Sequence, residues 1–435
     1  YDESGHLTME RYLDADGMPC AMGAGYASVL RTFNAQGKIL TEQYLNTEGH
    51  PVVVSGYAMV AYTYDAMFNV TRVDYLDDKG MPAMHALGYA GIAYGYDTRG
   101  RQTSIRYLGL DGMPADCSSG YAGVDLVYDA YSRVSLETYI NQSGVPHMLG
   151  DGYAAVGYEY DARGNVTLKT YYDDLGQSTM TIGGYAKIAT QYDVFGRPVR
   201  ITYLDTMDMP VVMASGYAGI GYEYDLYSRV IREVYYGPEG NISLIAMCFG
   251  ERLFAYDARG NMTREAYGDG WGNLVISPDG YAAIEREFDE RNLMTAVRYL
   301  GADNELVEIA EGYAAMERRY DERGRRIYER YLNDRGQMAR ISRGYAAISF
   351  AYDEADNVIL ETYYYEFDEP DMMPPGFAAI GYAYDAARNV IHVRYLDRKH
   401  QPVMLKDGYA QMEFAYDARN RRILERFLDE NGQPV

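Results

Sequence analysis

The sequence is poor in cysteine and in positive charge. Only three cysteines occur in 435 residues, Cys20, Cys117 and Cys248, and they lie far apart. An odd, scattered set of this kind predicts neither a disulfide framework nor a metal site. Lys and Arg total 40 against 63 Asp and Glu, which gives a formal net charge of -23. Such acidity argues against non-specific binding to nucleic acid and against docking on an anionic membrane surface.

Long apolar runs and catalytic motifs are missing as well. No stretch is long enough to span a membrane, so membrane insertion is not predicted. The six histidines share no regular spacing, and no phosphate-binding loop, nucleophile elbow or dinucleotide fingerprint is present. We therefore expect no catalytic residue, no metal and no cofactor, and a protein that is not an enzyme.

Tyrosine is abundant: the chain has 48 tyrosines against 11 phenylalanines and one tryptophan. The tripeptide Gly-Tyr-Ala begins at residues 25, 56, 88, 120, 152, 184, 216, 280, 312, 344 and 408. Cys248-Phe249-Gly250 and Gly376-Phe377-Ala378 fill the two remaining positions, so every step after the first is 32 residues. Each tripeptide is followed by Tyr-Asp or Phe-Asp/Asn, and then by another aromatic residue, usually a Tyr and often before Leu. A fixed period of this length indicates a repeat architecture.

Each repeat has the pattern of a β-hairpin. Between residues 217 and 224, Ala218, Ile220, Tyr222 and Tyr224 alternate with small or polar residues, which predicts a strand with one buried face. Asp161-Ala162-Arg163-Gly164 then has the chemistry of a type I turn. The β-branched and aromatic run at 165–172 predicts the second strand. A short third stretch begins near a proline such as Pro114, which restricts it to an edge or a strand start.

The sequence thus predicts an all-β fold, a repeat array of about thirteen stacked 32-residue β-hairpin units forming a β-solenoid or spiral sheet. No linker is evident, so residues 1–435 are expected to form a single tandem array. Because the chain starts at Tyr1 and stops within a repeat, we expect it to be a fragment of a longer protein.

The hairpin motif resembles a known family. The segments Tyr158-Glu159-Tyr160-Asp161-Ala162-Arg163-Gly164-Asn165-Val166 and Tyr192-Asp193-Val194-Phe195-Gly196-Arg197 look like the YD repeat of Rhs and teneurin proteins. That resemblance implies hairpins that wind into a spiral shell, which encloses a toxin domain or serves adhesion at a cell surface. A weaker similarity is to the aromatic, glycine-rich repeats of bacterial choline- and glucan-binding modules, which hold ligands between aromatic rings.

The Tyr-Asp pairs recur in nearly every repeat, whereas a catalytic residue is usually singular. We interpret them as structural, with stacked Tyr rings forming a ladder and each Asp closing a turn.

The tyrosines of Gly-Tyr-Ala are the candidate binding residues. The alternation places them on the second face of the strand, opposite the apolar face and among small or polar residues. One interpretation is a second packed ladder; the other is a periodic aromatic platform on which a sugar chain stacks. With the lone tryptophan, in a turn that breaks the pattern, the candidates are Tyr57, Tyr89, Tyr121, Tyr153, Tyr185, Tyr217, Tyr281, Tyr313, Tyr345, Tyr409 and Trp271.

Other departures from the repeat occur at residues 248–250 and 363–375, and drift within one repeat explains them most simply. The arginines between Arg318 and Arg343 are interleaved with Glu and Asp, so we expect a solvated face there.

We expect a non-catalytic bacterial surface or secreted module that binds an extended polymer such as cell-wall or other polysaccharide. The first alternative is a purely structural Rhs-like shell, spacer or adhesin stalk without its own small ligand. The second is an accessory repeat region attached to a catalytic domain elsewhere in the parent protein. The expected partners are thus a polysaccharide or other domains of the same protein, at an extracellular or cell-surface location.

Overall fold

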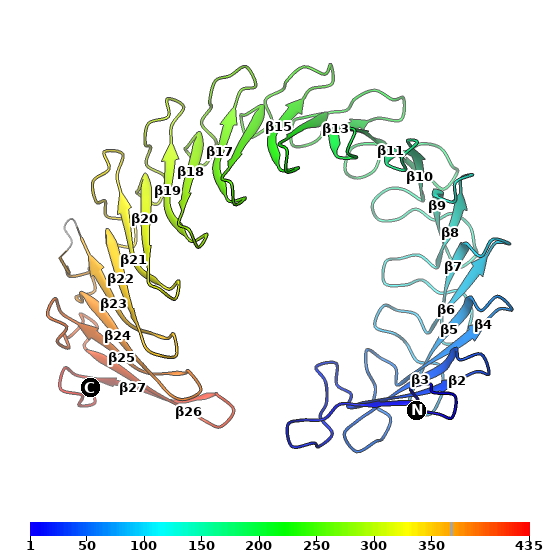
Figure 1. Cartoon of the computed structure of the whole chain (residues 1–435), viewed down its shortest axis with the longest axis horizontal. Helices are drawn as coiled ribbons and strands as arrows, with labels where there is room; N and C mark the ends of the chain where they lie inside the picture. The colour runs from blue at the N-terminus through cyan, green and yellow to red at the C-terminus, as the bar shows by residue number, and fades with distance from the viewer. Residues whose placement is uncertain (366–368) are drawn as a thin grey trace. The chain divides into compact units, whose positions relative to one another are not determined.

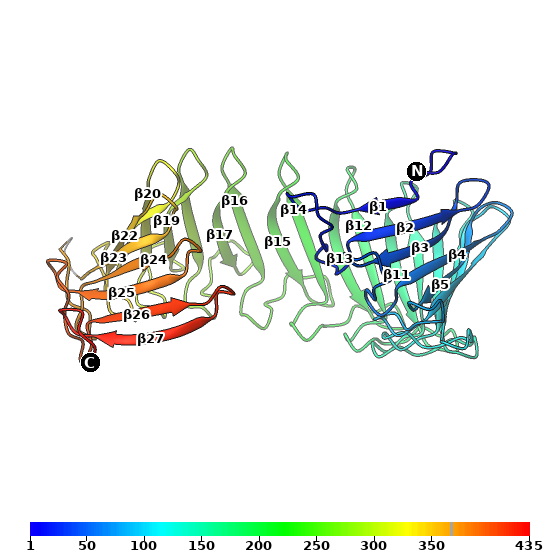
Figure 2. The same ribbon diagram turned by 90° about the horizontal axis from the view of Figure 1, so that it is seen from below.

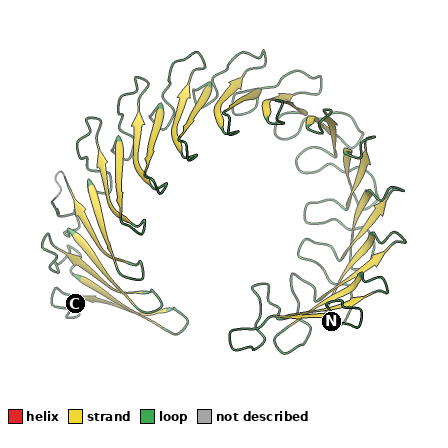
Figure 3. Ribbon diagram, in the orientation of Figure 1, coloured by secondary structure: helices red, strands yellow, loops and turns green. Residues whose placement is uncertain are grey.

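The computed structural model describes residues 1–365 and 369–435, and the regular elements in this part of the chain are all strands (Figure 3). The predicted all-β class is therefore confirmed. The same residues form no helix that is long and apolar enough to cross a membrane.

The chain divides into two compact units, Tyr1–Ala214 and Ser215–Val435, coloured from blue to green and from green to red in Figure 1. Each unit is by itself an unbroken series of hairpins. The expectation of a single array over residues 1–435 stays a prediction.

The first unit contains β1 (Met9–Arg11), β2 (Ser28–Phe33), β3 (Ile39–Leu45), β4 (Met59–Tyr64), β5 (Val70–Leu76), β6 (Gly91–Tyr96), β7 (Gln102–Leu108), β8 (Gly123–Tyr128), β9 (Val134–Ile140), β10 (Ala155–Tyr160), β11 (Val166–Tyr172), β12 (Lys187–Tyr192) and β13 (Pro198–Leu204). The second unit contains β14 (Gly219–Tyr224), β15 (Val230–Tyr236), β16 (Glu251–Tyr256), β17 (Met262–Gly268), β18 (Ala283–Phe288), β19 (Met294–Leu300), β20 (Ala315–Tyr320), β21 (Arg326–Leu332), β22 (Ala347–Tyr352), β23 (Val358–Tyr364), β24 (Ala379–Tyr384), β25 (Val390–Leu396), β26 (Gln411–Tyr416) and β27 (Arg422–Leu428).

Every even-numbered strand forms an antiparallel hairpin with the strand that follows it. In β10–β11 the pairing runs from Ala155↔Tyr172 to Tyr160↔Val166, with a register shift between Glu159 and Tyr160. Six such hairpins in the first unit and seven in the second confirm the predicted thirteen.

Neighbouring hairpins of one unit also pair antiparallel, but over a shorter register. β11 and β12 are joined only from Leu168↔Ala189 to Thr170↔Lys187. Figure 2 shows strands lying side by side in this order within each unit. The junction between hairpins therefore has half the backbone pairing found inside a hairpin, and side chains must supply the rest.

The predicted turn chemistry is present. Asp161 Oδ1 accepts hydrogen bonds from the backbone N–H groups of Arg163 and Asn165, at 2.8 and 2.9 Å. Gly164 has a φ of 91°, a left-handed conformation that glycine adopts without steric cost. The Asp and the Gly of the motif thus close the hairpin together.

The third stretch of each repeat is a single bridge rather than a strand. Pro114 bridges Leu108, the last residue of β7, and Ala115 N–H donates to the Tyr107 carbonyl at 3.0 Å. Proline has no N–H, which limits how far such a stretch can extend a sheet.

The alanine of Gly-Tyr-Ala lies at the junction between hairpins. Ala154 is fully buried; its N–H donates to the Tyr172 carbonyl of its own hairpin, and its carbonyl accepts from Tyr139 of the preceding hairpin. The inward Val156 beside it is 5% exposed. Alanine is small enough to let two backbones approach here, which explains its recurrence.

We predict that Ala154→Val destabilises the β9–β10 junction by about 1–3 kcal/mol, because the added methyl groups overpack a closed site. Ala162→Val, in an exposed turn of the same repeat, is the matched control. Hydrogen exchange of β9 and β10 measures the effect, and equal exchange in the two variants would contradict the prediction.

Candidate functional site

The tyrosines of Gly-Tyr-Ala lie in a continuous ladder of aromatic rings within each unit. The ring of Tyr153 is 6.0 Å from that of Tyr139 in the preceding hairpin and 4.9 Å from that of Tyr171 in its own. Both pairs are T-shaped, an arrangement in which the positive edge of one ring meets the negative face of the other.

The same alternation continues along both units with centroid distances of 4.7–6.0 Å, and we call the whole set the ring ladder. In the first unit it consists of Tyr12, Tyr26, Tyr44, Tyr57, Tyr75, Tyr89, Tyr107, Tyr121, Tyr139, Tyr153, Tyr171, Tyr185 and Tyr203. In the second unit it consists of Tyr217, Tyr235, Phe249, Tyr267, Tyr281, Tyr299, Tyr313, Tyr331, Tyr345, Tyr363, Phe377, Tyr395, Tyr409 and Phe427.

The ring ladder lies on the apolar face, so the predicted placement on the opposite face is wrong. Tyr217 packs with the buried cluster of Ile220, Tyr235 and Phe249. β14 begins only at Gly219, after Gly216 with a φ of 95°. The strand alternation therefore does not extend back to Tyr217, and the bend before the strand turns the ring onto the face of Ile220.

The candidate tyrosines are only partly accessible. Tyr89 and Tyr345 are 7% exposed, and the other Gly-Tyr-Ala tyrosines are half-buried. Nine of the ten named tyrosines have ring neighbours on both sides, and Tyr217, at the start of the second unit, has Tyr235 on one side. Sugar binding by them stays a prediction.

Half-buried glutamates such as Glu137 anchor phenols of the apolar face. Glu137 accepts hydrogen bonds from Tyr139 at 3.1 Å and from Tyr158 of the next hairpin at 3.2 Å. Burial, and then the Glu137 carboxylate, raise the pKa of Tyr139 above its ordinary 10.0 and that of Tyr158 to about 12. These phenols are therefore neutral over the physiological pH range.

The tyrosines of the Tyr-Asp pairs work through their hydroxyl groups. Tyr160 Oη donates to the Val134 carbonyl in the preceding hairpin at 2.6 Å. This contact, rather than the predicted stacking of Tyr-Asp rings, is what recurs. The pairs are Tyr64–Ile39, Tyr96–Val70, Tyr128–Gln102, Tyr160–Val134, Tyr192–Val166, Tyr256–Val230, Tyr320–Met294, Tyr352–Arg326 and Tyr384–Val358.

The short pairing between hairpins explains why that carbonyl is available. Val134 opens β9 and pairs with Tyr128 inside its own hairpin. The pairing of β9 with β10 ends at Leu136↔Gly157, so no backbone N–H of β10 reaches the Val134 carbonyl. The hydroxyl of the next hairpin satisfies it, so the Tyr-Asp tyrosine acts as a bridge between repeats.

Arginines at the hairpin turns make a further connection. Arg133 binds the Asp129 carboxylate of its own turn at 2.7 Å and donates to the Asp161 carbonyl of the next turn at 3.0 Å. Its guanidinium lies 4.4 Å from the centroid of the Tyr160 ring, a favourable cation–π geometry.

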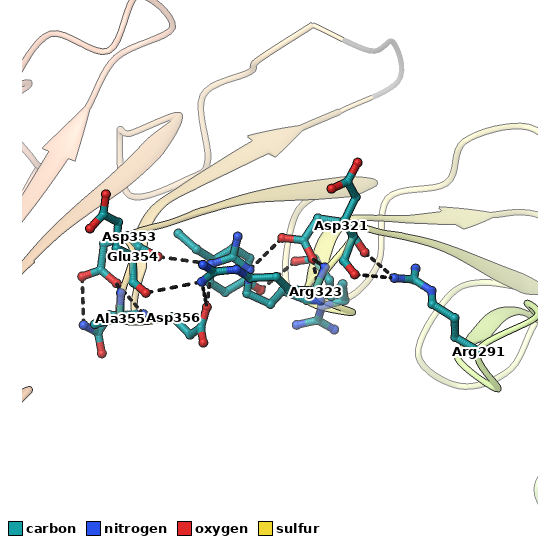
Figure 4. Close-up of polar contacts among 12 residues, drawn as sticks. Arg291, Asp321, Arg323, Asp353, Glu354, Ala355 and Asp356 are labelled. Carbon is teal, nitrogen blue, oxygen red and sulfur yellow. Dashed lines mark hydrogen bonds and ion pairs between the residues drawn. The ribbon is translucent and has the colours of Figure 1, made fainter.

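Figure 4 shows related turn contacts in the second unit. Arg291 donates to the Asp321 carbonyl at 2.7 Å, and Arg323 donates to Glu354 O at 3.3 Å and to Asp356 Oδ1 at 3.1 Å. These charged groups are paired with the neighbouring turn instead of converging on an open pocket.

The remaining candidate, Trp271, lies apart from the ring ladder. Its side chain is 69% exposed in a turn where the backbone N–H of Trp271 donates to Asp269 Oδ1 at 2.7 Å. Of the pattern break at 363–375, residues 366–368 lie outside the described residues. No cluster of three or more His, Cys, Asp or Glu side chains that could hold a metal is found in the described part of the chain.

The segment between Arg318 and Arg343 is only partly solvated, so that expectation needs correction. The side chain of Glu329 is 5% exposed and binds Arg318 Nε at 2.6 Å on the apolar face. Sequence reasoning missed this ionic cluster, although one signal was present: Arg286 and Arg318 stand where neighbouring repeats have Phe254 and Phe350.

No protein-family model matches the chain, and no curated protein matches it. Among solved structures, the TcdB2-TccC3-TEV crystal structure has 13% identity over 92% of this chain and 22% of that chain, with a TM-score of 0.28. TcdB2-TccC3 has 14% identity over 92% and 24%, with a TM-score of 0.22. The Photorhabdus luminescens Tc holotoxin pore has 11% identity over 94% of this chain and 25% of that chain, with a TM-score of 0.18.

The chain thus spans about a quarter or less of the length of these structures. At such identities and TM-scores, no conclusion about the function of this chain follows from these structures. The likeness to choline- and glucan-binding repeats stays an expectation from the sequence.

We predict that Tyr160→Phe costs about 0.5–1.5 kcal/mol at the β9–β10 junction, because the Val134 carbonyl loses its donor. Tyr131→Phe, whose side chain is 81% exposed, is the matched control and is expected to be neutral. Hydrogen exchange at β9 and β10 measures the stability of the junction in both variants. Unchanged exchange in Tyr160→Phe would show that the hydroxyl does not stabilise the junction.

The raised phenol pKa values predict a loss of stability in alkali. The folded pKa values lie above the unfolded 10.0, so the stabilisation is complete below about pH 10 and is lost as the pH rises through the folded values. The urea unfolding midpoint should be constant up to about pH 10 and should fall as the pH rises further. Phenolate absorbance supplies the control, since the folded chain should titrate later than the denatured chain; coincident titrations would contradict the prediction.

Proposed function

We propose that the chain is a non-catalytic structural repeat module of an extracellular or cell-surface protein, whose partners are other domains of that same protein. This is the role that the resemblance to YD-repeat proteins implies. This role requires no small ligand. The module would form a stable wall or spacer within the larger protein.

One observation carries the proposal: the recurrent aromatic rings contact each other. In a sugar platform, rings offer a free face to the ligand. Here Tyr121 is flanked by Tyr107 at 5.8 Å and Tyr139 at 5.0 Å, and Tyr185 by Tyr171 at 5.7 Å and Tyr203 at 5.2 Å. The repeated feature therefore serves contacts between repeats.

The recurrent polar groups support the same interpretation. The Tyr160 hydroxyl is bonded to a neighbouring carbonyl, and the Asp161 carboxylate to its own turn. Arg133 bridges two successive turns. Groups that are occupied in this way stabilise the array and are not free for catalysis.

Polymer binding is the competing function, supported by the half-buried state of most ring-ladder tyrosines. It requires that rings with neighbours on both sides still offer an edge to a sugar. An accessory role beside a catalytic domain would use the same structural module and makes no separate demand on these residues.

We predict that Tyr121→Ala, Tyr153→Ala and Tyr185→Ala, combined in one variant, lower the unfolding midpoint of the first unit strongly. Each substitution removes a partly buried ring. Removing a fully buried aromatic lowers the free energy of unfolding by about 3–5 kcal/mol, and a partly buried ring contributes less. Tyr131→Ala, outside the ring ladder, is the matched control. Thermal unfolding by circular dichroism measures the midpoints.

Retention on insoluble cell-wall and glucan preparations separates the two functions. The structural role predicts that wild type and Tyr131→Ala are retained no better than an unrelated acidic protein. If wild type is specifically retained and the folded ring-ladder variant is not, polymer binding is the function and the structural proposal is wrong. A ring-ladder variant as stable as wild type would also overturn the proposal.

A further inference from the structure

The second unit has a cavity of about 530 Å³ on its apolar face. It is lined by the hairpins β18–β19 and β20–β21 and by the loops that contain Glu311 and Arg343. Ser342 N–H donates to the Glu311 carbonyl at 3.2 Å, which ties the two loops together beside the cavity. Volumes of this order hold small organic ligands.

Two arginines line this cavity at a position where nearby repeats have rings. Six residues after the repeat glycine, the side chain faces inward, and it is Tyr222, Phe254 and Phe350 in nearby repeats. In the two repeats of the cavity the position is taken by Arg286 and Arg318, both of which line it. A break in two successive repeats makes this place singular in the array.

Arg318 has a buried counter-ion. Glu329 Oε2 accepts from Arg318 Nε and from Arg326 Nη1, both at 2.6 Å. Glu329 also accepts from the Tyr331 hydroxyl, so one carboxylate already serves three donors. The Glu329 carboxylate therefore accepts its hydrogen bonds from residues that line the cavity.

Arg286 has only a longer ion pair. Its cross-strand neighbour is Val297, where Arg318 faces Glu329. The nearest carboxylate oxygen is Glu265 Oε2 at 3.7 Å, and the other oxygen of Glu265 is taken by Arg252 at 2.6 Å. Arg286 Nη1 is buried and makes no hydrogen bond. A buried donor without an acceptor is costly, and a ligand that brings an acceptor relieves that cost.

The lining is positive although the chain is acidic. Four arginines, Arg286, Arg318, Arg326 and Arg343, face two glutamates, Glu311 and Glu329. Tyrosines of the ring ladder complete the wall and offer apolar surface. Guanidinium groups bind carboxylate and phosphate oxygens in pairs, which suits an anion carried on a ring.

We infer that this cavity binds a small organic anion, a sugar-sized ring bearing a carboxylate or a phosphate, with Arg286 and Arg343 as the anion-binding groups. The inference goes beyond the structural role, which needs no ligand and is unaffected if the cavity stays empty.

Isothermal titration calorimetry of the full chain with glucuronate and with glucose 6-phosphate tests it, with glucose as the neutral control. At least one anionic sugar should bind and glucose should not; the two anions distinguish carboxylate from phosphate. Arg286→Gln should weaken that binding by about tenfold or more, since a charge-assisted hydrogen bond is lost.

The matched control is Arg298→Gln in the same hairpin, whose guanidinium pairs with Glu287 at 2.6 Å outside this lining. It should leave binding unchanged. Arg343→Gln, on an exposed loop, provides a second test if Arg286→Gln does not fold. Binding by neither anion, equal binding of glucose, or full affinity in both Arg286→Gln and Arg343→Gln would overturn the inference.

Discussion

Successive hairpins pair over only three residues, and each unit depends on what else crosses that junction. Three contacts recur there. The backbone of a buried alanine, such as Ala154, bonds to both hairpins; the hydroxyl of Tyr160 bonds to the carbonyl of Val134; and the rings of Tyr139, Tyr153 and Tyr171 pack in series. Because these contacts join only neighbours, stability within a unit is built up one junction at a time.

This constraint explains why the chain uses tyrosine where phenylalanine would pack as well. Beyond the three paired residues, the carbonyl of Val134 faces the next hairpin without a backbone donor, and the phenol of Tyr160 supplies both a ring and a hydroxyl there. At Phe288 the hydroxyl is absent, yet the same register shift is kept between Glu287 and Phe288. The register shift therefore does not depend on the hydroxyl.

The regular part of the repeat and its exceptions play different roles. Where the consensus holds, as at Tyr153 or Asp161, side chains are bonded within the array. Where it fails, as at Arg252, Arg286 and Arg318, charges enter the apolar face, and the Nη1 atom of Arg286 has no hydrogen-bond partner. Singular chemistry in a repeat protein is thus to be sought at its departures from the consensus.

The sequence by itself determined the repeat, the hairpins, the turns and the all-β class, because each rests on local rules. Period-two alternation and Asp-x-x-Gly turns depend on residues a few positions apart, and the 32-residue period repeats these local patterns along the chain. The structure confirms the strands, the turns and the repeat that they predict. The sequence also identified the Gly-Tyr-Ala tyrosines as a regular series. It could not assign their face, since Tyr217 lies before the start of β14, beyond the reach of the strand alternation.

Only the tertiary structure decided which groups meet across repeats. The partner of Tyr160 is 26 residues away, and the two counter-ions of Arg252 depend on the register of three strands from two hairpins. The arginines near Arg318 were expected to be solvated because Glu and Asp alternate with them along the chain. Pairing of β20 with β21 instead turned Arg318 and Glu329 to the same buried face, and spatial register, not sequence spacing, sets such contacts.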